Sequence, residues 1–255
     1  MNLEDRMKSY EQAARTVLPR RLPIIIRVDG KGFSDYTKQL PGKPFDRNFI
    51  SVMESTARAL CQEIQGAQMA YVQSDEISVL VHGYKKFESE PWFGNQVQKM
   101  VSVSAAVASA TFTANSWRMW AKLAVRDADP LPSIGDIEPA YFDARVFVVP
   151  EADVANYFLW RQRDGIRNSI QMYARSHFSH SELHKKGTNE MVEMCKAKGH
   201  DWHALPPSLR NGRAVYRDCK LIDGTWRSHF VTDTNVPLFV NDKHYIERHL
   251  ALEEE

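Results

Sequence analysis

The chain has 255 residues, and with 43% hydrophobic and 25% charged residues its composition is typical of a globular protein. No apolar run approaches the roughly 18 residues of a membrane-spanning helix, and a net charge of +1 excludes an overall basic field that would attract nucleic acid. The three cysteines lie far apart without C-x-x-C spacing, which argues against a disulfide framework or zinc knuckle and predicts a cytoplasmic protein.

The first predicted elements are a helix, a strand and a second helix. Residues 1–16 are typical of an amphipathic helix and lack the apolar core of a signal peptide. The short β-branched run 23–28 predicts a buried strand. In 45–66, apolar residues recur at helical spacing, with Asp46 as the expected N-cap and Gly66 as the expected C-cap.

A β-hairpin is predicted next. Two strand-like runs, 67–73 and 77–83, are joined by Ser74, Asp75 and Glu76. The acidic residues of this segment are therefore expected at the turn.

Small residues over 96–120 then predict a long helix, although its β-branched members weaken the helical propensity. An irregular loop is expected over 125–143, before a strand over 144–150. The order β-α-β-β-α-β is that of ferredoxin-like α+β folds, in which one antiparallel sheet carries two helices on one face.

After residue 150 the pattern becomes helical, over 151–178 and again over 188–199. Residues 213–232 predict a β-hairpin that turns at Asp223-Gly224. We expect residues 1–150 to form the ferredoxin-like domain. Residues 151–255 would be an appended subdomain, with helices and a β-hairpin, within the same compact unit.

The ends of the first strand and of the hairpin carry carboxylates. Asp29 ends the strand, and Asp75 and Glu76 lie at the hairpin turn, so the topology is expected to bring them to one sheet edge. Like charges that close are costly unless a cation neutralises them. Oxygen ligands suit Mg²⁺, and two such ions can hold the attacking and leaving oxygens of a phosphoryl transfer.

The glycines beside Asp29 fit the same interpretation. Gly30 lets its carbonyl approach a metal, and Gly32 leaves backbone amides free to face a triphosphate. The stretch GKGFSD does not match the G-x-G-x-x-G dinucleotide fingerprint, and it is not a Walker A loop. On these residues alone, the alternative to a metal site is that the segments at Asp29-Gly30 and at Ser74-Asp75-Glu76 are two ordinary turns.

An ordered set of motifs resembles the tRNA-His guanylyltransferase family, and in particular its bacterial-type guanylyltransferase-like members. The resemblance covers roughly residues 1–200. The stretches that carry it are RVDGKGFSDYT, KPFD, AYVQSDEISVLV, FTANSW, FDARVFVVP and RNSIQMYARSHFSHSELHKKGTNEM.

This resemblance implies a polymerase-palm domain that adds nucleotides to the 5′ end of tRNA, in the 3′-to-5′ direction. The 5′-phosphate would first be activated with ATP or GTP, and the 3′-hydroxyl of an incoming nucleoside triphosphate would then attack it. Two Mg²⁺ ions would be needed, and the family's habit implies a homotetramer.

The resemblance also implies roles for individual residues. Asp29 and Asp75 would ligate both metals, the Gly30 carbonyl would ligate one, and Glu76 would support the metal site from close by. The expected nucleotide-binding residues are Arg27, Asp29, Gly30, Lys31, Gly32, Phe33, Ser34, Lys43, Asp46, Ser74, Asp75, Lys99 and Asn168. The expected RNA-binding residues are Arg175, His177, Lys185 and Lys186.

The chain departs from the eukaryotic members at residues 167–173, which read RNSIQMY where those members carry a His-Ile-Asn-Asn-Leu-Tyr-Asn type of segment. That segment is associated with adding one untemplated G, so template-directed repair of tRNA 5′ ends is favoured over strict tRNA-His guanylylation. A nucleotidyl cyclase and a catalytically inactive RNA-binding module are two further alternatives. His177, His180 and His184 follow i, i+3, i+7 spacing, but we favour hydrogen bonding or RNA contacts over a zinc site.

Overall fold

The computed structural model describes residues 1–38, 40–83, 89–127, 129–131, 133 and 138–250. Its strands are Ile24–Gly30 (β1), Ala67–Gln73 (β2), Glu76–Val81 (β3), Phe142–Val148 (β4), Arg213–Ile222 (β5) and Thr225–Asp233 (β6). Its helices are Leu3–Ala13 (α1), Phe33–Lys38 (α2), Arg47–Glu63 (α3), Val97–Asp127 (α4), Glu151–Arg175 (α5), His180–Leu183 (α6), Thr188–Ala197 (α7), Pro207–Arg210 (α8) and His244–Glu247 (α9).

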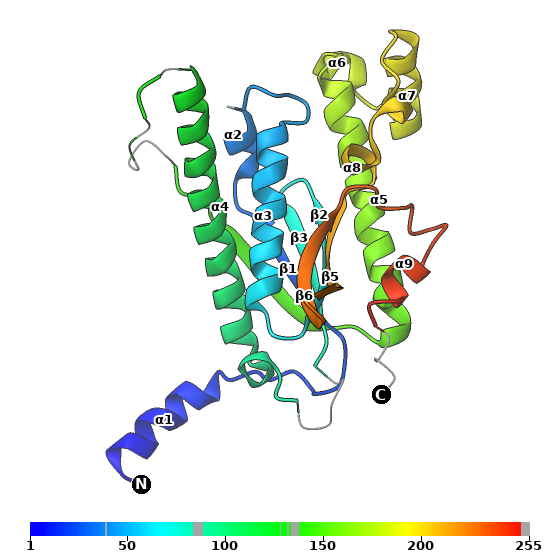
Figure 1. Ribbon diagram of the computed structural model, residues 1–255. Coiled ribbons are helices and arrows are strands. Elements are labelled where there is room, and N and C mark those ends of the chain that lie inside the picture. Colours follow the sequence, from blue (N-terminus) through cyan, green and yellow to red (C-terminus); the bar gives the residue numbers. More distant parts are fainter. Residues whose placement is uncertain (39, 84–88, 128, 132, 134–137, 251–255) are drawn as a thin grey trace.

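The described strands form one sheet in the order β4-β1-β3-β2-β5-β6, and all neighbours pair antiparallel. The first four strands and the helices α3 and α4 make the predicted β-α-β-β-α-β unit, so the ferredoxin-like α+β prediction is confirmed. The predicted hairpin is also present, and it extends the sheet beyond β2 (Figure 1).

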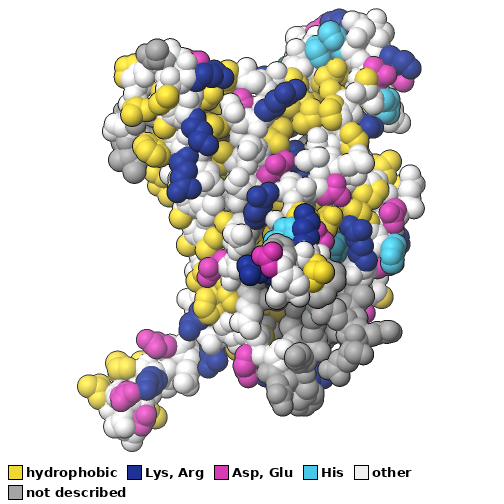
Figure 2. Space-filling model, viewed as in Figure 1, with side chains coloured by type: hydrophobic (Ala, Val, Ile, Leu, Met, Phe, Trp, Pro, Cys, Tyr) yellow, Lys and Arg dark blue, Asp and Glu magenta, His cyan; other side chains and the backbone are white. Residues whose placement is uncertain are grey.

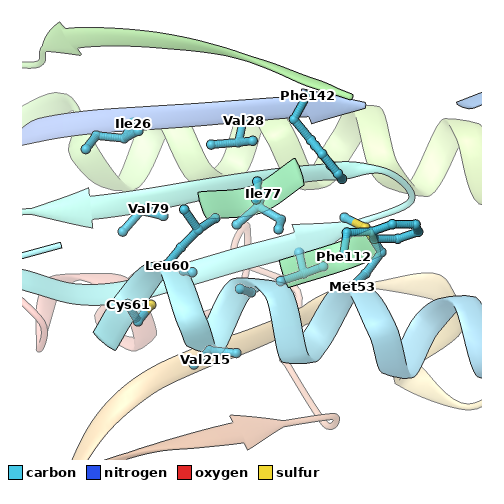
Figure 3. Close-up of a cluster of buried hydrophobic side chains, with 14 of the residues drawn as sticks. Ile26, Val28, Met53, Leu60, Cys61, Ile77, Val79, Phe112, Phe142 and Val215 are labelled. Atoms are coloured by element: carbon cyan, nitrogen blue, oxygen red, sulfur yellow. The ribbon is translucent and has the colours of Figure 1, made fainter. Parts of the chain in front are cut away.

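Helices α3 and α4 cover one face of the sheet, as expected. Their apolar residues pack on alternate sheet residues such as Ile26, Val28 and Val79, and together they form the larger buried cluster (Figure 3). At one end of this cluster Phe112 of α4 lies 5.1 Å from Phe33, measured between ring centroids. The packing of α4 therefore reaches the segment that follows Asp29.

Helix α3 begins where the sequence predicts, because the Asp46 side chain accepts a hydrogen bond from the Phe49 amide at 2.8 Å. The predicted C-cap at Gly66 is wrong by two residues. The helix ends at Glu63, and buried Ile64 leaves the helix in an extended conformation. Gly66, with φ of +85°, then supplies the left-handed turn into β2.

Helix α5 covers the other face of the sheet, together with the C-terminal segment. Its residues Val154, Tyr157 and Phe158 pack with Met69 and Leu80 in a second buried cluster. This is the face onto which the side chains at positions 27, 29, 76 and 78 project, because alternate residues of a strand point to opposite sides. Helix α5 therefore lies over the face that carries the acidic side chains.

The predicted helix over 151–178 ends at Arg175, and the predicted second helix is α7. Because α5 stops there, His177, His180 and His184 do not share one helical face. The ring of His177 instead stacks on His200, with centroids 3.8 Å apart.

Helix α1 projects from the rest of the chain and buries none of its side chains (Figure 1). Helix α4 runs to Asp127, beyond the predicted 120, and part of the loop expected over 125–143 lies outside the described residues. Within the part of the chain that the structure describes, no helix is both long and apolar enough to cross a membrane.

Candidate active site

The end of β1 and the β2–β3 turn lie side by side. Asp29 is directly opposite Glu76 in the sheet, and the Gly30 amide donates a hydrogen bond to the Asp75 carbonyl at 3.1 Å. Strands β1 and β3 are antiparallel neighbours, so the end of β1 lies beside the start of β3. The structure therefore brings Asp29, Asp75 and Glu76 to one corner of the sheet.

The carboxylates of this corner are held in an unfavourable electrostatic environment. Burial raises the pKa of Asp29, and the negative charges of Asp75 and Asp143 raise it further, while Arg27 and Arg161 oppose the shift. Burial also raises the pKa of Asp75, against hydrogen bonds that include one from Ser74. A cation between Asp29 and Asp75 would relieve this repulsion.

The donor set fits Mg²⁺. Among the described residues no three His, Cys, Asp or Glu side chains gather into a metal cage. Asp29 and Asp75 would provide two carboxylates, and substrate phosphates and water would complete the coordination, which is the usual arrangement for this ion.

Asp143 is a member of the corner that sequence reasoning missed. It lies on β4 directly opposite Asp29, and its side chain is 57% exposed, with Arg145 at 3.9 Å. The predicted strand began at 144 and left Asp143 in a loop. The alternation of FDARV, with Phe142 buried and Asp143 outward, was the signal that could have included it.

The loop after Asp29 folds tightly over the aromatic end of the core. A Cβ atom at Gly30 would lie 2.4 Å from the Phe33 ring, which is itself buried. Gly32 has φ of +72°, and the Lys31 amide bonds the Tyr141 carbonyl at 2.8 Å. Phe33 is therefore a core anchor for the loop, and Ser34 is exposed on its outer side.

Replacing Gly30 by Ala is expected to destabilise the fold by about 1–3 kcal/mol, because the Phe33 ring is enclosed and cannot retreat from the new methyl group. Urea unfolding measures this change. Gly83→Ala is the control, since a Cβ there meets nothing within 4 Å, and it should change stability by less than about 0.5 kcal/mol. Equal stabilities for the two variants would contradict the described loop.

A cavity of about 460 Å³ opens beside the acidic corner. It lies between the α2 region, the segment before α3, the β2–β3 turn, helix α5 and the start of β5, and this volume suits a nucleotide. Predicted residues that line it are Phe33, Ser34, Lys43, Asp46, Ser74, Asp75, Asn168 and Arg175. The Asp46 carboxylate is already bonded to the amides of Gly42 and Phe49, so it shapes the cavity wall.

Successive turns of α5 contact the acidic face of the sheet. The Tyr157 hydroxyl lies 2.8 Å from Ser78 Oγ, and Arg161 binds Glu76. One turn further, Gly165 leaves room for Gln73, whose Oε1 would lie 2.8 Å from a Cβ at position 165. Sequence reasoning missed these α5 contacts, because helical spacing does not reveal which strand residues a helix will meet.

Arg27 shares the face of Asp29. It is half-buried, its Nε has no hydrogen-bond partner, and its positive charge opposes the upward pKa shifts of Asp29 and Glu76. This placement is compatible with the expected contact to phosphate.

Lys99 is not brought to this corner. It lies in the first turn of α4, next to Met100, which lines a separate cavity together with Ile24 and Val81. Ile24 is at the opposite end of β1 from Asp29, about 16 Å away at strand spacing. Within one chain Lys99 therefore lies away from this corner, and its expected contact with a nucleotide stays a prediction.

The expected RNA-binding residues lie at or beyond the end of α5. Arg175 lines the cavity, and His177, Lys185 and Lys186 lie past the helix end, around α6. Figure 2 shows a hollow between two projections, one formed by α4 and the other by α6 and α7, with Lys and Arg side chains on both.

Comparisons with known proteins agree with this architecture. The family model described as tRNAHis guanylyltransferase matches residues 4–150. A probable tRNA(His) guanylyltransferase of Drosophila melanogaster is 31% identical over 227 residues, which is 83% of this chain and 72% of that protein.

Two solved structures are similar over nearly the whole chain. A bacterial tRNA(His) guanylyltransferase (Thg1)-like protein in complex with ATP is 36% identical with a TM-score of 0.85, covering 99% of this chain and 100% of that one. A second, in complex with GTP, is 34% identical with a TM-score of 0.80, covering 98% and 99%. The chain therefore belongs to the tRNA(His) guanylyltransferase family of nucleotidyltransferases.

Proposed function

We propose that this protein adds nucleotides to the 5′ ends of tRNA in the 3′-to-5′ direction, after ATP or GTP activates the 5′-phosphate. The observation that carries the proposal is the meeting of Asp29 and Asp75 beside a cavity of nucleotide size. The similar bacterial proteins in complex with ATP and GTP support the choice of nucleotides.

Asp29, Asp75 and the Gly30 carbonyl would hold two Mg²⁺ ions, which would neutralise the charge that develops on the transferred phosphate. The residues of the 30–34 loop, of which Phe33 and Ser34 line the cavity, would hold the triphosphate together with Ser74, and Lys43 would contact phosphate from the cavity wall. Asn168 would approach the nucleoside, because it lines the same cavity from α5. Holding both reactants in one geometry supplies much of the rate in transfers of this kind.

Repair of 5′-truncated tRNA, directed by the opposite strand, is the favoured reaction, and strict guanylylation of tRNA-His is the alternative. Residues 167–173 support this choice, because they differ from the eukaryotic segment and lie on α5, where Asn168 faces the cavity. The proposal also includes a cytoplasmic homotetramer and the division of each chain at residue 150 into a palm-like domain and an appended subdomain.

The test combines the protein with Mg²⁺, ATP, GTP and a 5′-monophosphorylated tRNA that lacks its first nucleotide. Extension of the 5′ end by the nucleotide complementary to the template strand is the expected result. A single G added to intact tRNA-His, without repair of other tRNAs, would favour the strict enzyme.

Two further outcomes would contradict the proposal. A dinucleotide formed without RNA would indicate a nucleotidyl cyclase. RNA binding without nucleotide consumption would indicate an inactive binding module, a reading that the costly cluster of carboxylates already disfavours.

A further inference from the structure

Glu76 differs from Asp29 and Asp75 in how its carboxylate is bonded. Arg161 Nε donates to Glu76 Oε1 and Arg161 Nη2 donates to Glu76 Oε2, both at 2.7 Å. The side chains of Glu76 and Arg161 are only 8% and 6% exposed. Both carboxylate oxygens of Glu76 are thus bound to one guanidinium, in the bidentate geometry that gives the strongest such pairs.

Arg161 is itself fixed from two further directions. Its Nη2 also donates to Asp164 Oδ2 at 2.9 Å, and Arg167 pairs with the other oxygen of Asp164. The guanidinium lies 4.4 Å from the Trp160 ring centroid. Glu76, Arg161, Asp164 and Arg167 therefore form a chain of alternating charge that ties the sheet to α5.

The position of Glu76 makes this chain relevant to the site. Glu76 is the first residue of β3, directly after Asp75, and it stands opposite Asp29 in the sheet. A helix that grips Glu76 at both oxygens also fixes the β2–β3 turn. The distance between the Asp75 and Asp29 carboxylates then depends on α5.

We propose that Arg161 is a positioning residue, which holds Glu76 and through it keeps Asp75 in register with Asp29. Glu76 is the anchor of this ion pair and not a ligand of the metals. The inference deepens the proposed function, on which its activity readout rests, but its metal-binding and stability readouts do not depend on tRNA.

The experiment is a double-mutant cycle with Glu76→Gln, Arg161→Met and the combined variant. Breaking a buried pair from one side leaves an uncompensated group, whereas removing both charges is often tolerated. Each single variant is therefore expected to lower the melting temperature of the metal-free protein and to slow 5′ extension at least about tenfold. The combined variant should recover most of the melting temperature, because no unpaired charge is left buried, but its 5′ extension should stay slow, because the link between α5 and the β2–β3 turn is still broken.

Mn²⁺ binding in the presence of GTP, measured by electron paramagnetic resonance, shows whether Glu76 anchors Arg161 or ligates the metal. Glu76→Gln, Arg161→Met and the combined variant should all bind Mn²⁺ more weakly and by a similar factor, because each breaks the same link, and Asp75→Asn should lose binding in every background. Mn²⁺ binding that is lost in Glu76→Gln but kept in Arg161→Met would overturn the proposal, because Glu76 would then be a ligand that does not need Arg161. Three variants that all behave like the unchanged protein would overturn the positioning role.

Two more variants guard against unfolding and nonspecific effects. Arg161→Lys keeps the charge but loses the paired geometry, so it should fold and still show slower extension with a weakened response to Mn²⁺. Full activity of Arg161→Lys would show that charge alone suffices and would contradict positioning. Arg163→Met, on the exposed side of the same helix, should leave Mn²⁺ binding and melting temperature unchanged.

If the unchanged protein extends no tRNA, the proposed function fails, while the Mn²⁺ and stability cycles still decide the role of Arg161. The converse result is that the unchanged protein extends tRNA normally while the effects of Glu76→Gln and Arg161→Met simply add in the combined variant. That result would support the proposed function and contradict the positioning role of Arg161.

Discussion

Replacing Asp29 or Asp75 by Asn is expected to abolish nucleotide transfer and, at the same time, to stabilise the metal-free protein. Activity should fall by about 1,000-fold or more, because neutralising the developing phosphate charge is worth several kcal/mol and each 1.36 kcal/mol is tenfold in rate. The opposite change in stability follows from electrostatics. Burial raises the pKa of both carboxyl groups, and Asp143 adds to the shift at Asp29.

Proton linkage determines whether the stability of the metal-free protein rises or falls with pH. A carboxyl group whose pKa is higher in the folded than in the unfolded state favours folding when it is protonated. The stability of the metal-free protein should therefore fall as the pH rises from the ordinary Asp range through the raised pKa values of Asp29 and Asp75. Thermal unfolding between pH 4 and pH 8 measures this fall, which should be shallower in Asp29→Asn and Asp75→Asn.

Mg²⁺ with GTP should raise the melting temperature of the unchanged protein and not that of the two variants, because bound ligand stabilises only a state that binds it. Asp127→Asn is the control. That residue pairs with Arg126, which lowers its pKa, so its replacement should not stabilise the protein and should leave transfer intact. Asn variants at 29 and 75 that retain transfer would contradict the proposed metal site.

Topology made the acidic corner predictable before any coordinates. The apolar run ending at Asp29 and the hairpin turning at Asp75 are strong local signals, and in a β-α-β-β-α-β sheet their strands are neighbours. The location of the corner follows from strand order, without knowledge of any side-chain contact.

The contacts made by α5 were not predictable in the same way. Helical periodicity shows that 151–175 is a helix, but its rotation and height over the sheet depend on packing with Met69, Leu80 and the C-terminal segment. The sequence therefore did not predict that Arg161 would form an ion pair with Glu76. The same limit applies to Lys99, since motif resemblance does not reveal at which end of α4 the acidic corner lies.

The C-terminal hairpin illustrates a second limit. Its strands and its Asp223-Gly224 turn are local features and were predicted. Its attachment to β2 is set by Val215 and Ala214, which enter the two buried clusters on opposite faces of the sheet. Strand propensity does not specify the partner edge, so the extension of the sheet appears only in the structure.

Replacing Phe112 by Ala is expected to cost about 3–5 kcal/mol of unfolding free energy, the usual range for a fully buried Phe. Phe112 has no exposed surface and packs edge-on against Phe33, Phe49 and Phe142, at centroid distances of 5.1, 5.9 and 5.6 Å. Urea unfolding measures the loss. Val125→Ala, on the exposed end of the same helix, should change stability by less than about 0.5 kcal/mol.

The same substitution should reach the active site through Phe33. That ring anchors the loop from Gly30 to Ser34, so a cavity beside it lets the loop shift while Asp29 and Asp75 stay in the sheet. Phe112→Leu, which keeps most of the volume and the fold, is therefore expected to raise the KM for the nucleoside triphosphate more than it lowers kcat. A stability loss below 1 kcal/mol for Phe112→Ala, or an effect of Phe112→Leu on kcat alone, would mean that the core under Phe33 does not hold the nucleotide loop.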